Sequence, residues 1–141
     1  MTCILRAGGT NFDVDDFIAK SPLVADSNWR RGERRFPHSK SSEEINDTSG
    51  IRVVASEADF SELLRQIEDA TVFLRQNKEA IQTLTSSPGV EWADLDFGAE
   101  IHPPGWASFK FPTELLLLAG TVGVSLCLSV YPTDTEGEPD A

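Results

Sequence analysis

The sequence predicts an α+β fold, in which helices pack on one face of an antiparallel or mixed sheet. Helix-like and strand-like segments follow one another in the order β-α-β-β-α-β-β-α-β, which a ferredoxin-like core with added strands fits best. Several segments alternate apolar and polar residues, as strands with one buried face do. Of the 141 residues, 40% are hydrophobic and 25% are charged, so we expect residues 1–132 to form a single globular domain.

The N-terminal part of the chain predicts a strand, a helix and a second strand. Residues 2–7, "TCILRA", are apolar enough for a first strand, which a pair of glycines ends. Residues 11–21 predict a short helix, because the side chain of Asp13 can cap its N-terminus. Residues 27–36 predict the second strand, and Gly32 within it indicates a bulge or a bend.

The middle of the chain predicts a loop, a strand and a long helix. Residues 37–50 are polar and rich in turn-forming residues, so we expect a long loop. Residues 51–56, "IRVVAS", are β-branched and predict the third strand. Apolar residues recur at helical spacing over residues 57–85, with a break into two helices expected at 69–71.

The C-terminal part predicts three more strands and one helix. Alternation over residues 90–101 predicts a strand, and a Pro-Gly turn at 102–105 leads to another predicted strand at 106–111. Residues 114–119 predict a short buried helix. Residues 124–131 alternate with period two, which predicts the last strand and not the second half of a membrane helix.

The chain is strongly acidic. Its 23 Asp and Glu residues against 12 Lys and Arg residues give a formal net charge of −11. Such a charge repels nucleic acids and anionic membranes, and it steers basic proteins toward the chain. We therefore expect a basic protein partner and neither a nucleic acid nor a membrane; solubility alone is the alternative explanation.

Four arginines nevertheless gather in "WRRGERRF", residues 29–36. On a strand they would point two to each face, so they form no continuous basic stripe. This pattern favours charged guards of an edge strand, which also balance acids elsewhere, over a nucleic-acid site. A carboxylate or other anion site is a further alternative, because guanidinium groups suit such ligands. The four are Arg30, Arg31, Arg34 and Arg35.

The candidate binding surface is the sheet face opposite the helices. In 90–101 the small and apolar residues from Ala93 to Ile101 form the buried side, and the intervening residues point outward. If 106–111 and 124–131 are neighbouring strands, their outward residues extend the same surface, which carries aromatic rings suited to binding a protein. The predicted partner-binding residues are Trp92, Asp94, Asp96, Trp106, Lys110 and Tyr131. An ordinary solvated face, a homodimer contact and a small-ligand or enzyme site are the alternatives.

No catalytic, cofactor or metal site is predicted. Asp94 and Asp96 have the spacing of a carboxylate pair, but alternating acids are common on exposed strands. The two histidines lie in a polar loop and a Pro turn, without a partner at metal-ligand spacing. The two cysteines, Cys3 and Cys127, are expected to be reduced and buried. We therefore expect a protein that is not an enzyme and that needs no cofactor.

Neither end of the chain predicts a membrane or secretion signal. The apolar run at 115–130 is shorter than the roughly 20 residues that a spanning helix needs. The first residues carry an arginine too early for a signal peptide, so a cytoplasmic location is expected. Residues 133–141 lack an apolar pattern and predict an acidic disordered tail.

Four segments together resemble a family of small uncharacterised bacterial domains similar to immunity proteins found beside polymorphic toxins. They are "FDVDDFIAKSPL", "WRRGE", "DLDFG" and "FPTELLLLAGTVGVSLCLSVY". The resemblance spans residues 4–132 and implies a binding protein without catalytic residues. It thus implies an immunity-type inhibitor, whose acidic surface would meet a basic toxin with fast, salt-sensitive association.

Overall fold

The computed structural model describes residues 2–133, which form four helices and a five-stranded mixed sheet and confirm the α+β class. The elements in chain order are β1 (Cys3–Gly9), α1 (Val14–Lys20), β2 (Ser27–Trp29), β3 (Ser49–Ser56), α2 (Leu63–Gln76), α3 (Lys78–Thr85), β4 (Trp92–Ile101), α4 (Thr113–Val122) and β5 (Ser125–Pro132). The predicted tail lies outside the described residues except for Thr133. No helix within residues 2–133 is long and apolar enough to span a bilayer.

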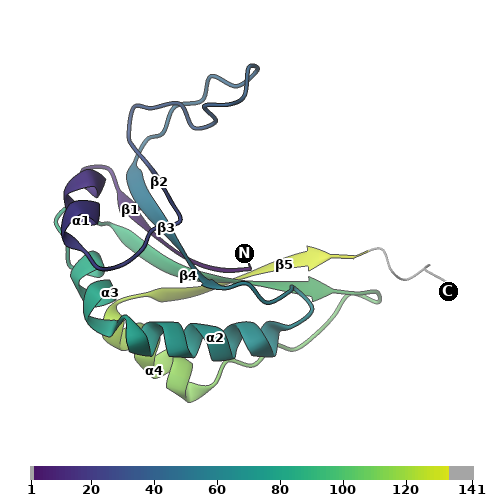
Figure 1. The fold of residues 1–141 in the computed structure, drawn as a ribbon. Coiled ribbons are helices and arrows are strands. Elements are labelled where there is room, and N and C mark those ends of the chain that lie inside the picture. Colours follow the sequence, from purple (N-terminus) through teal and green to yellow (C-terminus); the bar gives the residue numbers. More distant parts are fainter. Residues whose placement is uncertain (1, 134–141) are drawn as a thin grey trace.

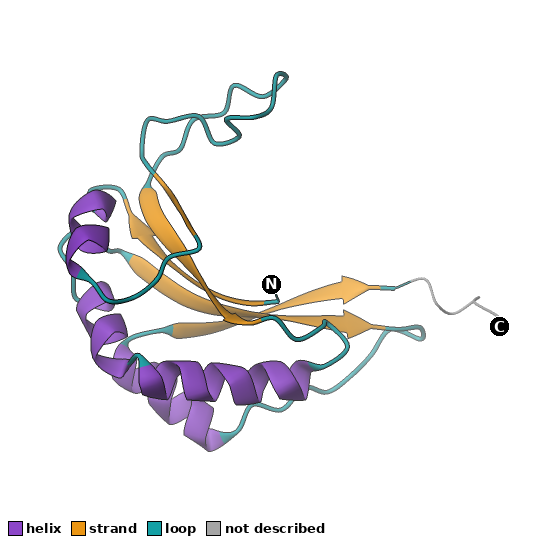
Figure 2. Cartoon of the chain, in the orientation of Figure 1, coloured by secondary structure: helices purple, strands orange, loops and turns teal. Residues whose placement is uncertain are grey.

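The strands lie in the order β2-β3-β1-β4-β5. Neighbours among the first four are antiparallel, and β5 is parallel to β4. From β1 to β4 the chain thus has the connections and strand order of a ferredoxin-like unit, to which α4 and β5 are added. All four helices cover one face of the sheet, and the other face is free of helices (Figures 1 and 2).

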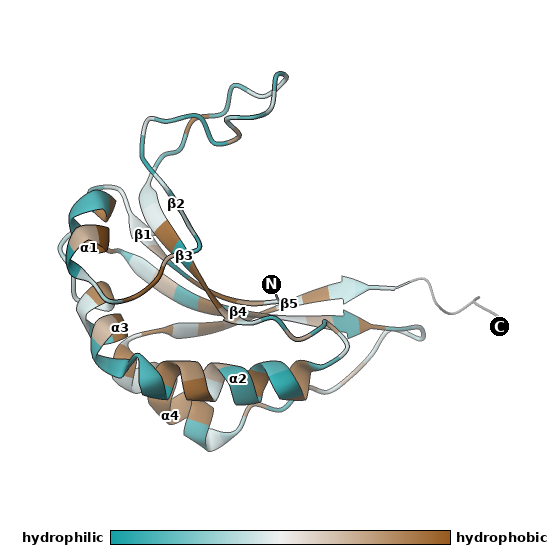
Figure 3. Ribbon diagram, viewed as in Figure 1, coloured by the Kyte–Doolittle hydropathy of each residue, from teal (hydrophilic) through white to brown (hydrophobic). Residues whose placement is uncertain are grey.

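The core lies between the helices and the inward side of the sheet. Leu5 in the central strand is opposite Val53 on one side and Leu95 on the other, and all three side chains are buried. The helices add apolar side chains at helical spacing, and Figure 3 shows apolar and polar stretches alternating along them. Each buried side chain of this size contributes roughly 2 kcal/mol relative to an exposed one. The buried apolar helix residues include Val14, Phe17, Ile67, Ala70, Leu74, Ile81, Leu84, Leu115, Ala119 and Val122.

The second predicted strand is much shorter than expected. Only Ser27–Trp29 pair with β3, and residues 30–48 form a loop that rises beyond the ends of β2 and β3 (Figure 1). The chain turns at Gly32, which has a φ of 88° in the left-handed region where glycine is favoured. The amide of Glu33 donates to the carbonyl of Arg30 and closes this turn. Of the bulge or bend expected at Gly32, a turn thus forms, and it follows the end of the strand at Trp29.

The predicted strand at 106–111 does not form. The edge of β4 that it would need is occupied by β5, which pairs with β4 from Asp94 to Ile101. The preceding prolines also lack the amide protons that a strand donates. Residues 102–112 instead form an extended connection, in which Phe111 lies 5.3 Å from the ring of Phe97 and so packs on the helix side of the sheet.

The long helical region also breaks later than predicted. Residues 57–62 form a loop, α2 begins at Leu63, and the break to α3 falls at Asn77 instead of at 69–71. Thr71 is accommodated within α2 because its hydroxyl donates to the carbonyl of Ile67 one turn earlier. The helix therefore continues through residues 69–71, where a break was predicted.

Candidate functional site

The helix-free face of the sheet, called here the open face, carries four of the six predicted site residues. Within β4 the alternation is confirmed, because Ala93, Leu95 and Phe97 are buried in the core while Trp92, Asp94 and Asp96 are only partly buried. On β5, Tyr131 is half exposed. Figure 1 shows that no helix lies over this face.

Trp106 and Lys110 do not join this surface by strand pairing, contrary to the prediction. Both lie in the connection 102–112, which forms no strand. The Trp106 side chain is 79% exposed, and Lys110 is exposed as well. The grouping failed because it assumed a strand at 106–111 beside β4, where β5 lies instead.

The two aromatic residues on the open face lie at its opposite ends, with Asp94 and Asp96 between them. Trp92 begins β4, whereas Tyr131 lies opposite Glu100, eight positions further along. At about 3.3 Å per residue, this separates the two rings by roughly 26 Å along the strand. The predicted site is therefore two regions: the tryptophan end, around Trp29 and Trp92, and the tyrosine end, around Phe60 and Tyr131.

Two glycines form the floor of the tryptophan end. Across the sheet, Trp29 is opposite Gly50, and Gly8 is opposite both Gly50 and Trp92. The two indole rings stack with centroids 6.1 Å apart and an interplanar angle of 17°. A Cβ on Gly50 would overlap the Trp29 ring, and one on Gly8 would lie 3.1 Å from the Trp92 ring. Sequence reasoning missed Trp29 as a site residue, although glycines within strands are a sign of close approach.

A row of charged residues crosses the sheet next to the tryptophans. Arg6 and Arg52 are direct partners in the β1–β3 register. Arg6 donates to a carboxylate oxygen of Asp96 at 2.9 Å, and the hydroxyl of Ser129 donates to the other oxygen at 2.8 Å. The Arg52 side chain makes no hydrogen bond or ion pair within residues 2–133, and its Nε is buried without a partner. Asp96 is thus engaged, while Arg52 is free to bind.

A groove of about 840 Å³ lies over this end of the open face. Its base is formed by residues of β1, β2, β3 and β4, and its other wall by residues of the loop 30–48. Trp29 is tied to this loop, because its indole Nε1 donates to the hydroxyl of Thr48 at 3.1 Å. The aromatic and basic lining residues are Trp29, Phe36, Trp92, Arg6, Arg35 and Arg52.

The clustered arginines anchor that loop. Arg30 binds the carboxylate of Asp15 on α1, with Nε 2.9 Å from one oxygen, and these hydrogen bonds lower the pKa of Asp15. Arg34 donates to the backbone carbonyls of Ser39 and Ser42 within the loop. These contacts agree with the interpretation of the cluster as counter-ions, but the edge strand that it was expected to guard ends at Trp29.

Arg35 is the member of the cluster that reaches the groove. It lies 3.4 Å from a carboxylate oxygen of Glu44, with its guanidinium 5.8 Å from the centroid of the Phe36 ring. Both partners of this ion pair are well exposed, so the pair contributes little to stability. Arg35 is therefore available to a bound anion.

The tyrosine end is built on a third glycine. The ring of Phe60, from the loop before α2, lies over Gly98 so closely that a Cβ there would overlap it. Phe60 also contacts Tyr131, with ring centroids 5.0 Å apart. The fully buried Gln66 positions this loop, because its side-chain amide bonds both the N–H and the C=O of Gly98 and also the carbonyl of Asp59.

Carboxylates lie on the segments that carry the aromatic pair: the loop of Phe60 with the start of α2, and the strand beside Tyr131. A hollow of about 450 Å³ beside Phe60 is lined by four acids and one arginine, Arg65. A fifth acid, Glu100, is the register partner of Tyr131 and lies 3.5 Å from His102. The acids are Glu57, Asp59, Glu62, Asp69 and Glu100. This end of the sheet is accordingly acidic, whereas the groove is basic.

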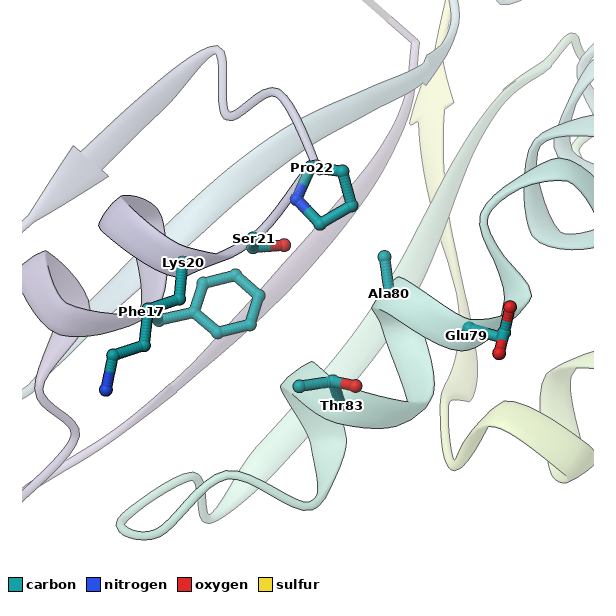
Figure 4. A pocket seen from close by; sticks show the side chains of 7 residues that line it. All are labelled: Phe17, Lys20, Ser21, Pro22, Glu79, Ala80 and Thr83. Atoms are coloured by element: carbon teal, nitrogen blue, oxygen red, sulfur yellow. The ribbon is translucent and has the colours of Figure 1, made fainter.

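A smaller cavity of about 240 Å³ separates α1 from α3. Phe17 points into it from α1 and faces Ala80 and Thr83, with Lys20 and Glu79 at its edges (Figure 4). Its lining is mostly apolar and holds no converging set of polar groups. It is a gap between two packed helices that offers little for recognising a ligand.

Within residues 2–133, no group of three His, Cys, Asp or Glu side chains is placed to hold a metal ion. Cys3 is buried as predicted, but Cys127 is exposed, because the period of two turns it to the open face. Partial desolvation and the nearby Asp96 raise the pKa of Cys127, which makes it a weaker nucleophile.

Comparison with known proteins found no matching family model, no matching curated protein and no matching solved structure. The resemblance to immunity proteins therefore stays a prediction. The assignment of function depends on the two ends of the open face.

Proposed function

We propose that this chain is a non-catalytic binding protein, an immunity-type inhibitor that binds a basic partner protein such as a toxin. The observation that carries the proposal is the tyrosine end, where a half-exposed Tyr131 contacts Phe60 and the loop of Phe60 borders a hollow lined by four carboxylates. Rigid aromatic rings are frequent energetic centres of protein interfaces, and a charged rim adds specificity. The proposal expects the partner in the cytoplasm with this chain.

The charge of the chain supports the same partner. A net charge of −11 accelerates the approach of a basic protein and slows that of an acidic one. The carboxylates at the tyrosine end give this attraction a definite place on the surface. Asp94 and Asp96 lie along the same face of β4, although Asp96 is already engaged by Arg6.

The test measures binding of the protein encoded beside this chain, the candidate toxin. We expect the association rate to fall at least about tenfold between roughly 0.05 and 0.5 M salt, because ions screen the attraction. Tyr131→Ala should weaken the complex about tenfold or more, as loss of a central aromatic side chain does. A rate that does not depend on salt would refute the steering argument.

Trp106→Ala is the matched control, because Trp106 is also an exposed ring but lies outside the tyrosine end. It should leave the affinity unchanged. Equal weakening by both variants would show that the tyrosine end is not the contact. Light scattering of the chain alone tests the homodimer alternative, since a stable dimer through the open face would block the partner.

The second candidate is a small-ligand or enzyme function on the open face. The groove at the tryptophan end favours the binding of a small ligand there.

A further inference from the structure

The groove at the tryptophan end has the size of a small-molecule site. Its volume of about 840 Å³ lies within the range of known ligand pockets, roughly 300–1,000 Å³. Four strands form its base and the loop 30–48 forms a wall, so a ligand would be held between two parts of the chain. The loop is fastened to the rest of the chain at Asp15, by Arg30, and at Trp29, by Thr48, which gives the wall a defined position.

The charged groups in the groove call for an anion. Arg6, Arg35 and Arg52 line it, and Asp47 is the one carboxylate among the lining residues that the structure describes. Arg6 and Arg52 are direct cross-strand partners, and Asp96 compensates the charge of Arg6 but not that of Arg52. Arg52 has no partner of its own within residues 2–133. Its guanidinium is therefore the natural receptor for a carboxylate or a phosphate.

The aromatic groups in the groove call for a flat ring. Trp29 and Trp92 form a stacked pair that is only partly buried, and both line the groove. Gly8 and Gly50 lie beneath the two rings. Because neither has a side chain, the rings can lie directly on the sheet. Aromatic walls of this kind bind planar rings by stacking and by removing apolar surface from water.

We propose that this groove binds a small organic anion in which a planar ring is joined to a carboxylate or a phosphate group. The ring packs against Trp29 and Trp92, and the anionic group meets Arg52 with help from Arg6 or Arg35. A small ligand is favoured over a nucleic acid because a chain with a net charge of −11 repels a polyanion far more than a singly or doubly charged molecule. This inference rests on the second candidate function, the small-ligand site, and concerns the opposite end of the sheet from the proposed toxin contact.

The experiment follows the indole N–H signals of the ¹⁵N-labelled chain by NMR during titrations. Three probes separate the chemistry: benzoate as a ring with a carboxylate, adenosine monophosphate as a ring with a phosphate, and inorganic phosphate as an anion without a ring. We expect benzoate or adenosine monophosphate to shift the Trp29 and Trp92 signals in a saturable manner. The signal of Trp106, outside the groove, should not move.

Arg52→Gln should weaken the binding of the effective probe about tenfold or more, because a charge-assisted hydrogen bond is lost. Arg65→Gln is the matched control, since it removes the same charge from the tyrosine end. If Arg52→Gln does not fold, Arg52→Lys keeps the charge, loses the fork and should weaken binding several-fold. Dispersed amide signals verify the fold of each variant.

Two results would overturn the inference. One is that neither benzoate nor adenosine monophosphate shifts the two groove signals, or that inorganic phosphate binds as tightly as either of them. The other is that Arg65→Gln weakens binding as much as Arg52→Gln, because the effect would then be one of general charge and not of the groove.

Discussion

The two ends of the open face share one arrangement, an aromatic ring over a glycine, but the charged residues near the rings have opposite signs. At each end an aromatic ring lies over a glycine of the sheet: Trp29 over Gly50 at one end and Phe60 over Gly98 at the other. The rings at the tryptophan end are framed by arginines and partly enclosed by a loop, whereas those at the tyrosine end are framed by carboxylates and open to solvent. One sheet can thus present two surfaces that select partners of opposite charge.

The ends differ in what holds the rings in place. Trp29 and Trp92 belong to strands, so the backbone of the sheet itself fixes them. Phe60 belongs to a loop, whose position depends on the buried amide of Gln66. The tryptophan end should therefore be sensitive to its glycine floor, and the tyrosine end to a single polar side chain.

The largest effect is expected from Gln66→Leu. This change leaves the N–H and C=O of Gly98 without partners, because β1 begins at Cys3 and does not pair with that part of β4. Each unsatisfied buried group costs about 1–3 kcal/mol, so the free energy of unfolding should fall by about 3 kcal/mol. Urea denaturation measures the loss.

Gln76→Leu serves as the control for that change, since Gln76 is the exposed last residue of the same helix. It should alter the stability by no more than about 0.5 kcal/mol. If Gln66→Leu were equally mild, the amide would not be what holds Phe60 over Gly98. The contrast between the ends would then need another explanation.

A smaller effect is expected from Gly50→Ala at the tryptophan end. The new methyl group would overlap the Trp29 ring and lie 2.5 Å from the carbonyl oxygen of Ala7, which belongs to the backbone and cannot turn away. Overpacking of this kind costs about 2 kcal/mol, and it should also separate the stacked indoles. Urea denaturation and the near-ultraviolet circular dichroism of the tryptophans measure the two consequences.

Gly120→Ala is the matched control, because a Cβ at this position in α4 meets nothing within 4 Å. It should stabilise the chain by roughly 0.5–1 kcal/mol, since alanine is the better helix former. A destabilisation by Gly50→Ala that left the indole signals unchanged would contradict the idea that this glycine makes room for Trp29.

Much of the fold could be predicted because its signals are local. Alternation in β4 identified its buried side, and Asp13 caps α1 by accepting from the amide of Asp16, as expected. The strand at 106–111 could not be judged in this way. Residues 106–111 do alternate, but whether they form a strand depends on which segment pairs with the edge of β4. β5, from a more distant part of the sequence, occupies that edge.

The candidate site was predicted less completely for a related reason. The sequence shows which residues of β4 and β5 point outward, and Trp92 and Tyr131 do lie on the open face. Strand order decides which outward residues are neighbours, and this order places β1 and β3 between the two tryptophans. Gly8 and Gly50 indicated that another group approaches the strands closely. A glycine in a strand does not, however, show which aromatic ring lies over it.

The mildest prediction concerns Cys127, which lies between the two ends as the register partner of Asp96. Partial desolvation, and then the charge and hydrogen bond of Asp96, raise the pKa of this thiol. A raised pKa lowers the thiolate fraction at any pH below it, so alkylation of the native chain by iodoacetamide at pH 8 should be slower than that of free cysteine. The rate should increase as the pH rises.

Asp96→Asn should accelerate that alkylation a few-fold, because it removes the negative charge that favours the neutral thiol and leaves only a weaker, neutral acceptor. Asp94→Asn also removes one carboxylate, but it acts on Cys127 only through a weaker Coulomb interaction, so its effect should be smaller. Mass spectrometry assigns the label to Cys127, since Cys3 is buried. A slower rate in Asp96→Asn would contradict the view that the carboxylate of Asp96 raises the pKa of Cys127, since losing this charge and releasing Arg6 from its ion pair both favour the thiolate.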